Sequence, residues 1–437
     1  MCFAMSINSL IEHLFRHQAA QMVATLTRAL GGRHLALAEE AVQDAMVTAL
    51  QQWPFRGVPS DPGGWLFRVA RNRALDRLRH HKVIADKVTE VRGSYEERAA
   101  PSPIEVVLQG EVPPLDDDQL GMMFLTCHPA IARESRVALT LKLVGGFGVG
   151  EIARAFLANE TAIQQRLVRA KRVLRDHDVP FGTPSSAELS TRLDSVLESL
   201  YLMFNEGYAA TEGDSLLRED IAAEAVRLTG LVTRHPVTST PCAWALRALL
   251  LLHGARFGSR VSSEGDLFLL RDQDRTKWDG SMLREGLHAL DRAASGEEIS
   301  QYHLEAEIAA CHAVARNWEA TDWPRILECY TALASLTGSP IVTLNAAIAR
   351  SRVEGPHAAI AQIERIVTHP SLATYHLLPA VLAELWREAG DPDRAAAYYR
   401  DALAFVQSAP ERRFLTIQLE CLASGKVSGP ATQRRRD

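Results

Sequence analysis

Hydrophobic positions along this chain recur every three or four residues, the period of an α-helix, and the alternation typical of β-strands is scarce. The first segment with this period covers residues 7–30, and the second covers residues 35–53. In the second segment the positions expected to face a core are Leu37, Val42, Ala45, Met46 and Ala49. Its acidic residues Glu39, Glu40 and Asp44 are expected to point outward. The pattern predicts an all-α fold.

Residues 65–82, WLFRVARNRALDRLRHHK, are predicted to form a helix whose two faces differ in charge. The apolar face consists of Leu66, Val69, Ala70, Ala74 and Leu78. The segment carries one acidic residue, Asp76, and six cationic residues, namely Arg68, Arg71, Arg73, Arg77, Arg79 and Lys82. Cations along a helix can follow phosphates, and Trp65 at its start can stack on an unpaired base. The segment therefore favours a nucleic-acid contact over an ordinary basic surface helix.

Proline and glycine mark the boundaries of this helical region. The loop of residues 54–64 is expected to end the second helix and to orient the basic one. Residues 83–119, which include the Asp116–Asp118 run, show little periodicity and are expected to form a solvated linker, with order resuming at Leu120.

Two short amphipathic segments predict a helix-turn-helix. The first covers residues 149–156, a break follows at 157–160, and the second covers residues 161–175. The second has a narrow apolar stripe of Ile163, Leu167, Ala170 and Leu174. Its opposite face carries Gln165, Val168, Arg169 and Arg172.

The C-terminal half is predicted to consist of helical hairpins, interrupted at residues 272–275. A four-then-three spacing of packing residues begins at Ile326, Ala359 and Ala395, which are 33 and 36 residues apart. This is close to the period of about 34 residues in tetratricopeptide repeats. Stacked helices of this kind have no chemistry of their own but supply a concave binding face.

Length and composition describe a multi-domain globular chain with local anionic contacts. The 437 residues suggest about three domains, and the net charge of −5 conceals basic clusters at residues 68–82 and 166–175. The six cysteines are scattered, without a CxxC pair. No secretory signal and no apolar run of membrane length is visible in the sequence. We expect a cytoplasmic protein with reduced thiols and no membrane association.

No stretch has the pattern of a catalytic or cofactor site. The glycines of residues 145–150 fail the dinucleotide fingerprint because position 151 is glutamate. Cys127–His128 and Cys311–His312 lack partners at metal-ligand spacing. The Asp116–Asp118 run and the pair Asp272 and Asp274 could supply metal carboxylates, but a solvated linker and a capped turn are the commoner explanation. We expect no catalytic residue, metal or cofactor, and an enzyme that uses nucleotides through residues 145–150 is the weakest alternative.

Two motifs resemble those of bacterial RNA polymerase sigma factors of the extracytoplasmic-function type. The family motif AEE-x-V-Q-(D/E), followed by WL-x-x-(V/I)A-x-N-x-x-x-D-x-x-R, is matched at Ala38–Asp44 and at Trp65–Arg79. The motif E-I-A, followed by T-V-x-x-R-L-x-R-A-(K/R), is matched at Glu151–Ala153 and at residues 162–171. Leu157 replaces the usual turn glycine, and Ala162 stands where threonine is common.

The C-terminal half looks like the subfamily of these factors that has a long extension ending in tetratricopeptide-like repeats. The matching stretches are LYLMFNEGYAA (200–210), EAVRL (224–228), DQDRTKWD (272–279), TDWPRI (321–326) and SPIVTLNAAIA (339–349). The implied division is a region 2-like domain at 1–88, a linker at 89–119, a region 4-like domain at 120–178, a linker at 179–186, a helical middle domain at 187–300, repeats at 301–425 and a basic tail at 426–437.

The resemblance implies an alternative sigma factor whose partners are core RNA polymerase, through its β′ clamp and β flap, and promoter DNA. Polymerase contacts are expected at Glu39, Glu40, Gln43 and Asp44. Contacts to the −10 element are expected at the loop of residues 54–64 and at Trp65, Arg68, Arg71, Asn72 and Arg79. Asn72 and Asp76 also fit a polar pair that braces the helix. Contacts to the −35 element are expected at Gln164, Gln165, Arg166, Arg169 and Arg172.

The extension is expected to regulate or stabilise the factor, with a possible regulatory partner at the repeats. The alternative is a stand-alone helix-turn-helix regulator with a repeat-based sensing domain. That alternative leaves the acidic second helix and the Trp65 helix without a role.

Overall fold

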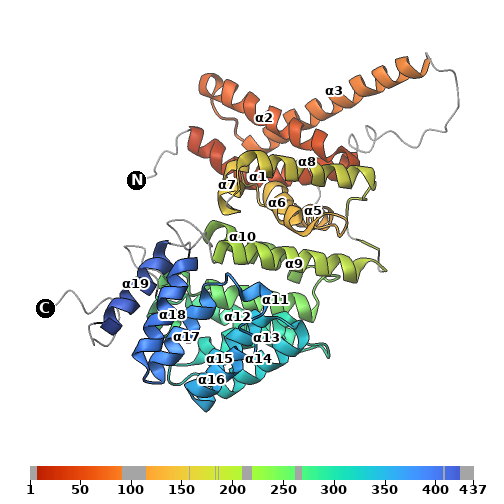
Figure 1. Ribbon diagram of the computed structural model, residues 1–437. Helices are drawn as coiled ribbons and strands as arrows, with labels where there is room; N and C mark the ends of the chain where they lie inside the picture. The colour runs from red at the N-terminus through yellow and green to blue at the C-terminus, as the bar shows by residue number, and fades with distance from the viewer. Residues whose placement is uncertain are drawn as a thin grey trace. The chain divides into compact units, whose positions relative to one another are not determined.

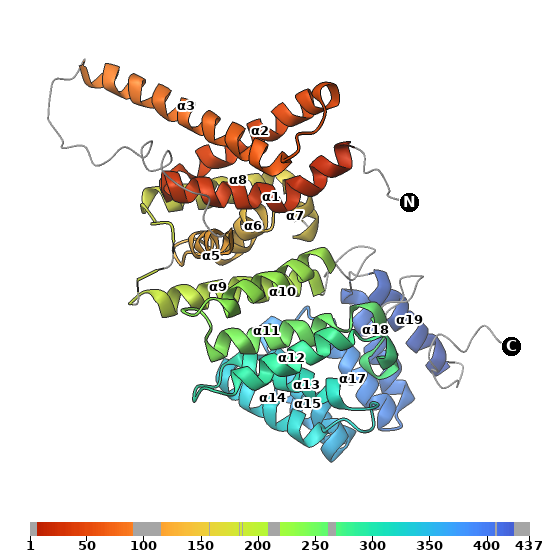
Figure 2. The same cartoon turned by 180° about the vertical axis from the view of Figure 1, so that it is seen from behind.

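The computed structural model describes residues 7–90, 115–156, 158–182, 184–185, 187–208, 219–260, 268–406 and 409–423. Within these ranges every regular element is an α-helix or a 3-10 helix, which confirms the all-α prediction (Figures 1 and 2). The chain divides into two compact units, Met1–Met203 and Phe204–Asp437. In the described part, no helix is both long and apolar enough to cross a bilayer.

Three long helices open the first unit. α1 (Ile7–Leu30) is followed by the turn η1 (Gly32–His34), by α2 (Leu35–Arg56) and by α3 (Pro62–Glu90). Both α1 and α3 pack on α2. The buried side chains of this bundle include Leu26, Val42, Met46, Trp53, Leu66 and Ala70. The apolar stripes visible in the sequence therefore meet in one core.

α2 does not end at Pro54, as the sequence suggested, but continues to Arg56. A proline here removes only the hydrogen bond to the carbonyl of Leu50, and Leu50 is 42% exposed, so water can solvate that turn. The helix ends instead at Gly57, whose φ of 79° lies in the left-handed region that favours glycine. The N–H of Gly57 donates to the carbonyl of Trp53 over 3.0 Å.

Four shorter helices follow in the first unit: α5 (Leu115–Thr126), α6 (Arg133–Leu143), α7 (Val149–Ala155) and α8 (Glu160–Asp176). α7 and α8 lie at the two segments predicted to form a helix-turn-helix, and α8 packs on both α6 and α7. The four residues of the predicted apolar stripe of α8 are all buried: Ile163, Leu167, Ala170 and Leu174. α9 (Leu189–Tyr208) then leads into the second unit.

Asp118 belongs to the first turn of α5 and not to a solvated linker, so α5 begins before the expected Leu120. Carboxylates are favoured at the positive end of a helix dipole. Asp118 is only 1% exposed, accepts a hydrogen bond from Thr25 over 2.7 Å and pairs with Arg28 over 3.2 Å. One buried carboxylate therefore joins α5 to α1.

The second unit is an array of helices that pack mainly on their neighbours in sequence. Its α-helices are α10 (Glu219–Arg234), α11 (Pro241–Gly254), α12 (Gly280–Ala293), α13 (Gln301–Val314), α14 (Trp323–Thr337), α15 (Pro340–Glu354), α16 (Pro356–Glu364), α17 (Leu377–Glu388), α18 (Pro392–Phe405) and α19 (Ala409–Ala423). Short 3-10 turns separate some of them: η2 (Phe257–Ser259), η3 (Leu270–Asp272), η4 (Arg275–Lys277) and η5 (Pro370–Leu372).

The repeated positions of the C-terminal half lie in the core of this array. The buried members are Ile326, Leu333, Ala359, Ile363, Ala395, Tyr399 and Ala402. Two helices also begin alike, because Asp322 and Asp391 accept hydrogen bonds from the backbone N–H groups of Arg325 and Arg394. The packing role that the spacing predicted is confirmed.

Candidate nucleic-acid interface

The start of α3 is built by a capped turn and an aromatic pair. Asp61 accepts a hydrogen bond from the Gly64 N–H over 2.9 Å, which stabilises the first turn. The next side chain, Trp65, packs on the buried Trp53 of α2, with ring centroids 5.6 Å apart and planes tilted by 60°. Trp65 is half-buried. It therefore serves first to seat α3 on α2, and only its uncovered part is open to a ligand.

The basic side of α3 divides into an exposed part and a paired part. Arg68, Asn72 and Arg79 are exposed, and Arg71 is half-buried. Arg79 is 3.7 Å from Asp76 in the same helix, a solvated pair that leaves its guanidinium available. Both views of the ribbon show that α3 extends beyond α2 toward its C-terminal end (Figures 1 and 2). Side chains beyond Arg79, among them that of the predicted cation Lys82, lie outside the described residues.

Arg77 does not belong to the exposed cationic face. Its guanidinium turns toward α2 and pairs with Glu40 and, over 2.7 Å, with Asp44. These two carboxylates are 64% and 42% exposed, so the pairing is a surface contact. It holds α3 against α2 and leaves both carboxylates accessible from solvent.

Glu39, predicted to point outward toward the polymerase, is instead buried, with its side chain 11% exposed. It forms an ion pair with Lys171 of α8, 132 residues later in the chain. A carboxylate that loses its water needs such a partner, because an unpaired buried charge is costly. Of the four predicted polymerase contacts, Glu40, Gln43 and Asp44 are therefore accessible and Glu39 is not.

α8 is a capped helix with polar and basic side chains on its exposed side. Asn159 caps it by accepting a hydrogen bond from the Ala162 N–H over 2.7 Å. With the apolar stripe buried, the exposed side carries Gln164, Gln165, Arg169 and Arg172. Glutamine can bind adenine and arginine can bind guanine, each through two hydrogen bonds in the major groove.

Two arginines of α8 already have protein partners. Arg166 is 28% exposed and lies 3.4 Å from Glu134 of α6, while Arg172 pairs with Asp176 over 3.3 Å. Arg169 therefore has the least encumbered guanidinium among the arginines predicted to contact DNA on this helix. Val168, 65% exposed between them, adds an apolar contact surface suited to a thymine methyl group.

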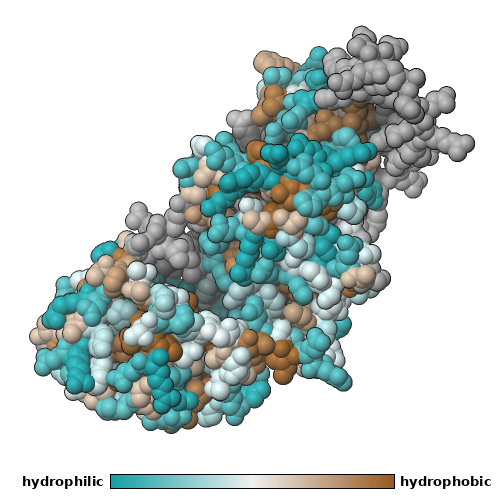
Figure 3. Space-filling view, turned by 45° about the vertical axis from the view of Figure 1, so that its right-hand side comes forward, coloured by the Kyte–Doolittle hydropathy of each residue, from teal (hydrophilic) through white to brown (hydrophobic). Residues whose placement is uncertain are grey.

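Sequence reasoning missed an exposed apolar surface at the end of α2. Phe55 is 89% exposed, and Val47 and Leu50 on the same helix are 50% and 42% exposed. The signal was visible as a phenylalanine directly after Pro54, but periodicity alone gave no reason to place it in solvent. On the face seen in Figure 3, hydrophobic patches lie scattered among hydrophilic surface. An exposed aromatic ring next to a basic helix is a further candidate for contact with a base or a protein.

Comparisons with known proteins match part of the chain to two family models and most of it to one relative. Residues 14–83 match Sigma-70 region 2, and residues 192–294 match a family of unknown function, DUF6596. An uncharacterized protein of Rhizobium meliloti (strain 1021) is 36% identical over 404 residues, which is 92% of this chain and 94% of the relative. No solved structure matches the chain. Neither family match includes α7 and α8, so the helix-turn-helix rests on its geometry.

Proposed function

This chain belongs to the same protein family as its relative from Rhizobium meliloti and carries a sigma-70 region 2, and we propose that it acts as an alternative sigma factor. It directs core RNA polymerase to a specific set of promoters and resembles the extracytoplasmic-function type. The observation that carries the proposal is the presence, on one chain, of region 2 with an exposed basic helix and of a second helix with an exposed Gln/Arg face.

In this proposal α3 binds the −10 element. Arg68, Arg71 and Arg79 contact phosphates of the melted strand, and Asn72 hydrogen-bonds a base or braces the helix. Trp65 positions α3 through Trp53 and offers its uncovered edge to an unpaired base. Phe55, which is far more exposed, joins it as a stacking candidate.

α8 binds the −35 element in the major groove. Gln164, Gln165 and Arg169 are assigned to base edges because their side chains are exposed. Arg166 and Arg172 are assigned to phosphates, because each would exchange a carboxylate partner for a phosphate.

Polymerase binding begins at the accessible residues of α2, which are Glu40, Gln43 and Asp44. The β′ clamp is the partner that the family resemblance implies for this surface, and the β flap is the partner implied for the α5–α8 domain. Glu39 can join the polymerase contact only after Lys171 releases it. The arrangement with Glu39 paired to α8 is therefore a closed form, and polymerase binding opens it.

The extension of the second unit regulates or stabilises the factor and resembles a tetratricopeptide array. Its contribution is separable by experiment from that of the promoter-binding helices, because the residues assigned to DNA all lie in the first unit. The chain is assigned no catalytic step and no cofactor.

Run-off transcription tests the proposal. Purified full-length protein is combined with core polymerase and the promoter region upstream of its own operon. We expect a discrete transcript that is lost with Arg169→Ala plus Arg172→Ala. Arg175→Ala is the matched control, because Arg175 lies on the same helix, is exposed and pairs with Asp176, but is not assigned to DNA.

Two results would refute the sigma-factor assignment. One is the absence of any transcript together with failure to co-elute with core polymerase. The other is tight binding to a palindromic duplex without polymerase, which is the behaviour of a stand-alone helix-turn-helix regulator.

A further inference from the structure

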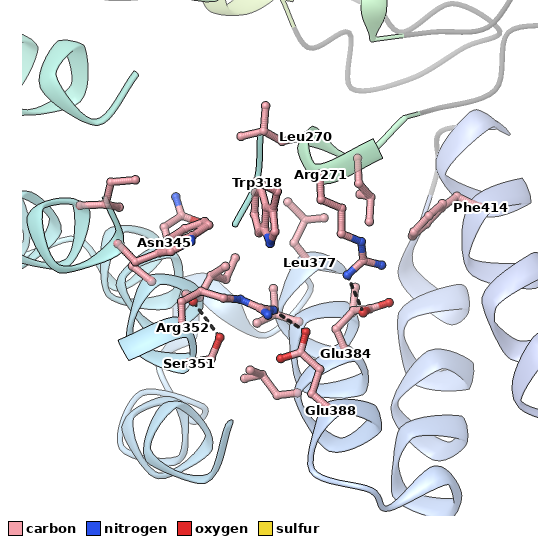
Figure 4. A pocket seen from close by; sticks show the side chains of 18 of the residues that line it. Leu270, Arg271, Trp318, Asn345, Ser351, Arg352, Leu377, Glu384, Glu388 and Phe414 are labelled. Atoms are coloured by element: carbon pink, nitrogen blue, oxygen red, sulfur yellow. Dashed lines mark hydrogen bonds and ion pairs between the residues drawn. The ribbon is translucent and has the colours of Figure 1, made fainter. Parts of the chain in front are cut away.

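The second unit contains a cavity of about 370 Å³ that none of the proposed promoter or polymerase contacts uses. Its walls come from η3, α13, α14, α15, α17, α18 and α19 and from Trp318, which lies between α13 and α14; Figure 4 shows most of these side chains. Apolar and aromatic side chains form most of the lining, among them Trp318, Ile348, Val381 and Phe414. Cavities of roughly 300–1,000 Å³ with mainly apolar walls and a few polar groups are typical binding sites for small molecules.

The arginines of the wall are paired with carboxylates, and the further lining carboxylate Glu411 faces His376 over 3.2 Å. Two carboxylates one turn apart on α17, Glu384 and Glu388, each receive an arginine from another element of the wall (Figure 4). Arg271 of η3 lies 3.4 Å from Glu384, and Arg352 of α15 pairs with Glu388. A charged ligand would have to break these pairs before it gained a partner of its own.

Among these four charged side chains, Glu384 makes the most hydrogen bonds and ion pairs. It also accepts hydrogen bonds from Arg387 over 2.6 Å and from the Tyr399 hydroxyl over 2.5 Å. Burial acts to raise the pKa of Glu384, but Arg271 and Arg387 together with these hydrogen bonds hold it below its usual value. The carboxylate is therefore ionised and fully engaged, and it offers little to a cationic ligand.

Two uncharged polar groups of the lining have hydrogen-bonding capacity that the described part of the protein does not use. Among the described residues the Asn345 side chain, which points into the cavity in Figure 4, makes no hydrogen bond to the protein. The ring Nδ1 of His312 is buried and likewise has no partner in the described part of the chain. Burial, reinforced by Arg256 and Arg275, lowers the pKa of His312 to about 3, so the ring is neutral. Both groups suit a neutral hydrogen-bonding ligand.

We propose that this cavity is a binding site for an uncharged, largely apolar small molecule, aromatic or alicyclic, with at least one hydrogen-bonding group. Trp318 and Phe414 provide aromatic walls, the two arginine–glutamate pairs exclude strong anions and cations, and Asn345 orients the ligand. The inference is independent of the sigma-factor proposal, since it concerns the second unit alone.

A matched pair of fluorescent probes tests the assignment on the full-length protein. N-phenyl-1-naphthylamine is uncharged, and 1-anilinonaphthalene-8-sulfonate is the same molecule with an added sulfonate. We expect saturable one-to-one binding of the uncharged probe, at least tenfold tighter than that of the sulfonate.

Variants that fill the cavity show where the probe binds. Ala380→Phe adds a ring inside the cavity and should weaken the uncharged probe at least tenfold. Ile348→Trp is the second filling variant, used if the first alters the thermal transition. Ala397→Phe is the matched control, because Ala397 is an exposed alanine of α18 outside the lining, and it should leave the affinity unchanged.

Three outcomes would overturn the proposal. The first is the absence of saturable binding, or equal affinity in the filled variants. The second is tighter binding of the sulfonate that is lost in Arg352→Gln, which would make the site an anion site. The third is displacement of the probe by short apolar peptides but by none of a panel of neutral aromatic and alicyclic compounds, which would make it a peptide groove.

Discussion

Lys171 of α8 forms an ion pair with Glu39 of α2, so the helix assigned to the −35 element holds a carboxylate assigned to the polymerase. The two side chains are only 24% and 11% exposed. Freeing Glu39 requires breaking its ion pair with Lys171 of α8. In the proposed function, the polymerase and Lys171 therefore compete for the Glu39 carboxylate.

Lys171→Ala tests that link. The change leaves Glu39 buried without its partner, which disfavours the closed form. We expect core polymerase to bind about tenfold more tightly, measured by fluorescence anisotropy of labelled protein, because binding selects the open form. Arg175→Ala, on the same helix, should leave the affinity unchanged. An unchanged or weaker affinity in Lys171→Ala would show that the pair does not limit polymerase binding.

The exposed cations of α3 should determine the salt dependence of promoter binding. Each phosphate contact contributes about 0.7–0.9 to the slope of log affinity against log salt. Arg68→Ala and Arg79→Ala should each reduce the slope of the holoenzyme by that amount. Arg77→Ala should not, because Arg77 is turned toward Glu40 and Asp44. Equal effects of all three substitutions in a salt titration would contradict the assignment of Arg68 and Arg79 as exposed cations and of Arg77 as a paired one.

Asp118 should contribute to the free energy of unfolding of the first unit. Asp118→Ala leaves Thr25 and Arg28 without their shared acceptor and removes a buried carboxylate with good geometry. We expect the free energy of unfolding to fall by about 1–3 kcal/mol in urea titrations, because Thr25 is buried while Arg28 is 40% exposed and can be solvated. Asp76→Ala, at an exposed carboxylate of α3, should change it by less than about 0.5 kcal/mol. A loss below about 1 kcal/mol for Asp118→Ala would argue against the contact.

The second unit should lose stability in mild acid because of His253. Burial lowers the pKa of His253 to about 3, with Arg256 and Arg260 adding to the effect. The folded state therefore keeps this ring neutral, while the unfolded state binds a proton below a pH of about 6.5. The free energy of unfolding should fall by about 2 kcal/mol per such group between pH 7 and pH 5, and the loss should level off near pH 3.

His253→Gln isolates this contribution. The pH dependence of unfolding should lose a slope of up to about one proton, because glutamine does not titrate and can still bond to the Tyr208 hydroxyl, which lies 3.3 Å from the ring. His288→Gln, at an exposed histidine of α12, should leave the slope unchanged. The same slope in His253→Gln as in the parent protein would mean that the ring is not held neutral.

The helices and their inner faces were predictable because their signal is local. The stripe of Ile163, Leu167, Ala170 and Leu174 lies within one helix, and any helix with that spacing must bury that side. The same reasoning placed Gln165, Arg169 and Arg172 on the outer side, where the structure has them. The repeated packing positions of the C-terminal half followed from the same periodicity.

The sequence predictions that the structure corrected concern mainly residues at which two helices meet. Glu39 looks like a surface acid in the sequence, and only the packing of α8 near α2 gives it Lys171 as a partner. The run at Asp116–Asp118 looked like a solvated linker until Thr25 and Arg28 of α1 supplied donors for Asp118. Pro54 looked like the end of a helix, yet an exposed last turn tolerates a missing hydrogen bond.

By itself the sequence determined which segments are helical, which faces are buried, and that basic and Gln/Arg faces are presented by two separate helices. Tertiary structure alone decided which charges are free and which are paired, and where a cavity forms among the helices of the second unit. The physical reason is range: helix periodicity depends on residues three or four positions apart. An ion pair across 132 residues, or a void between helices, depends on how whole helices pack.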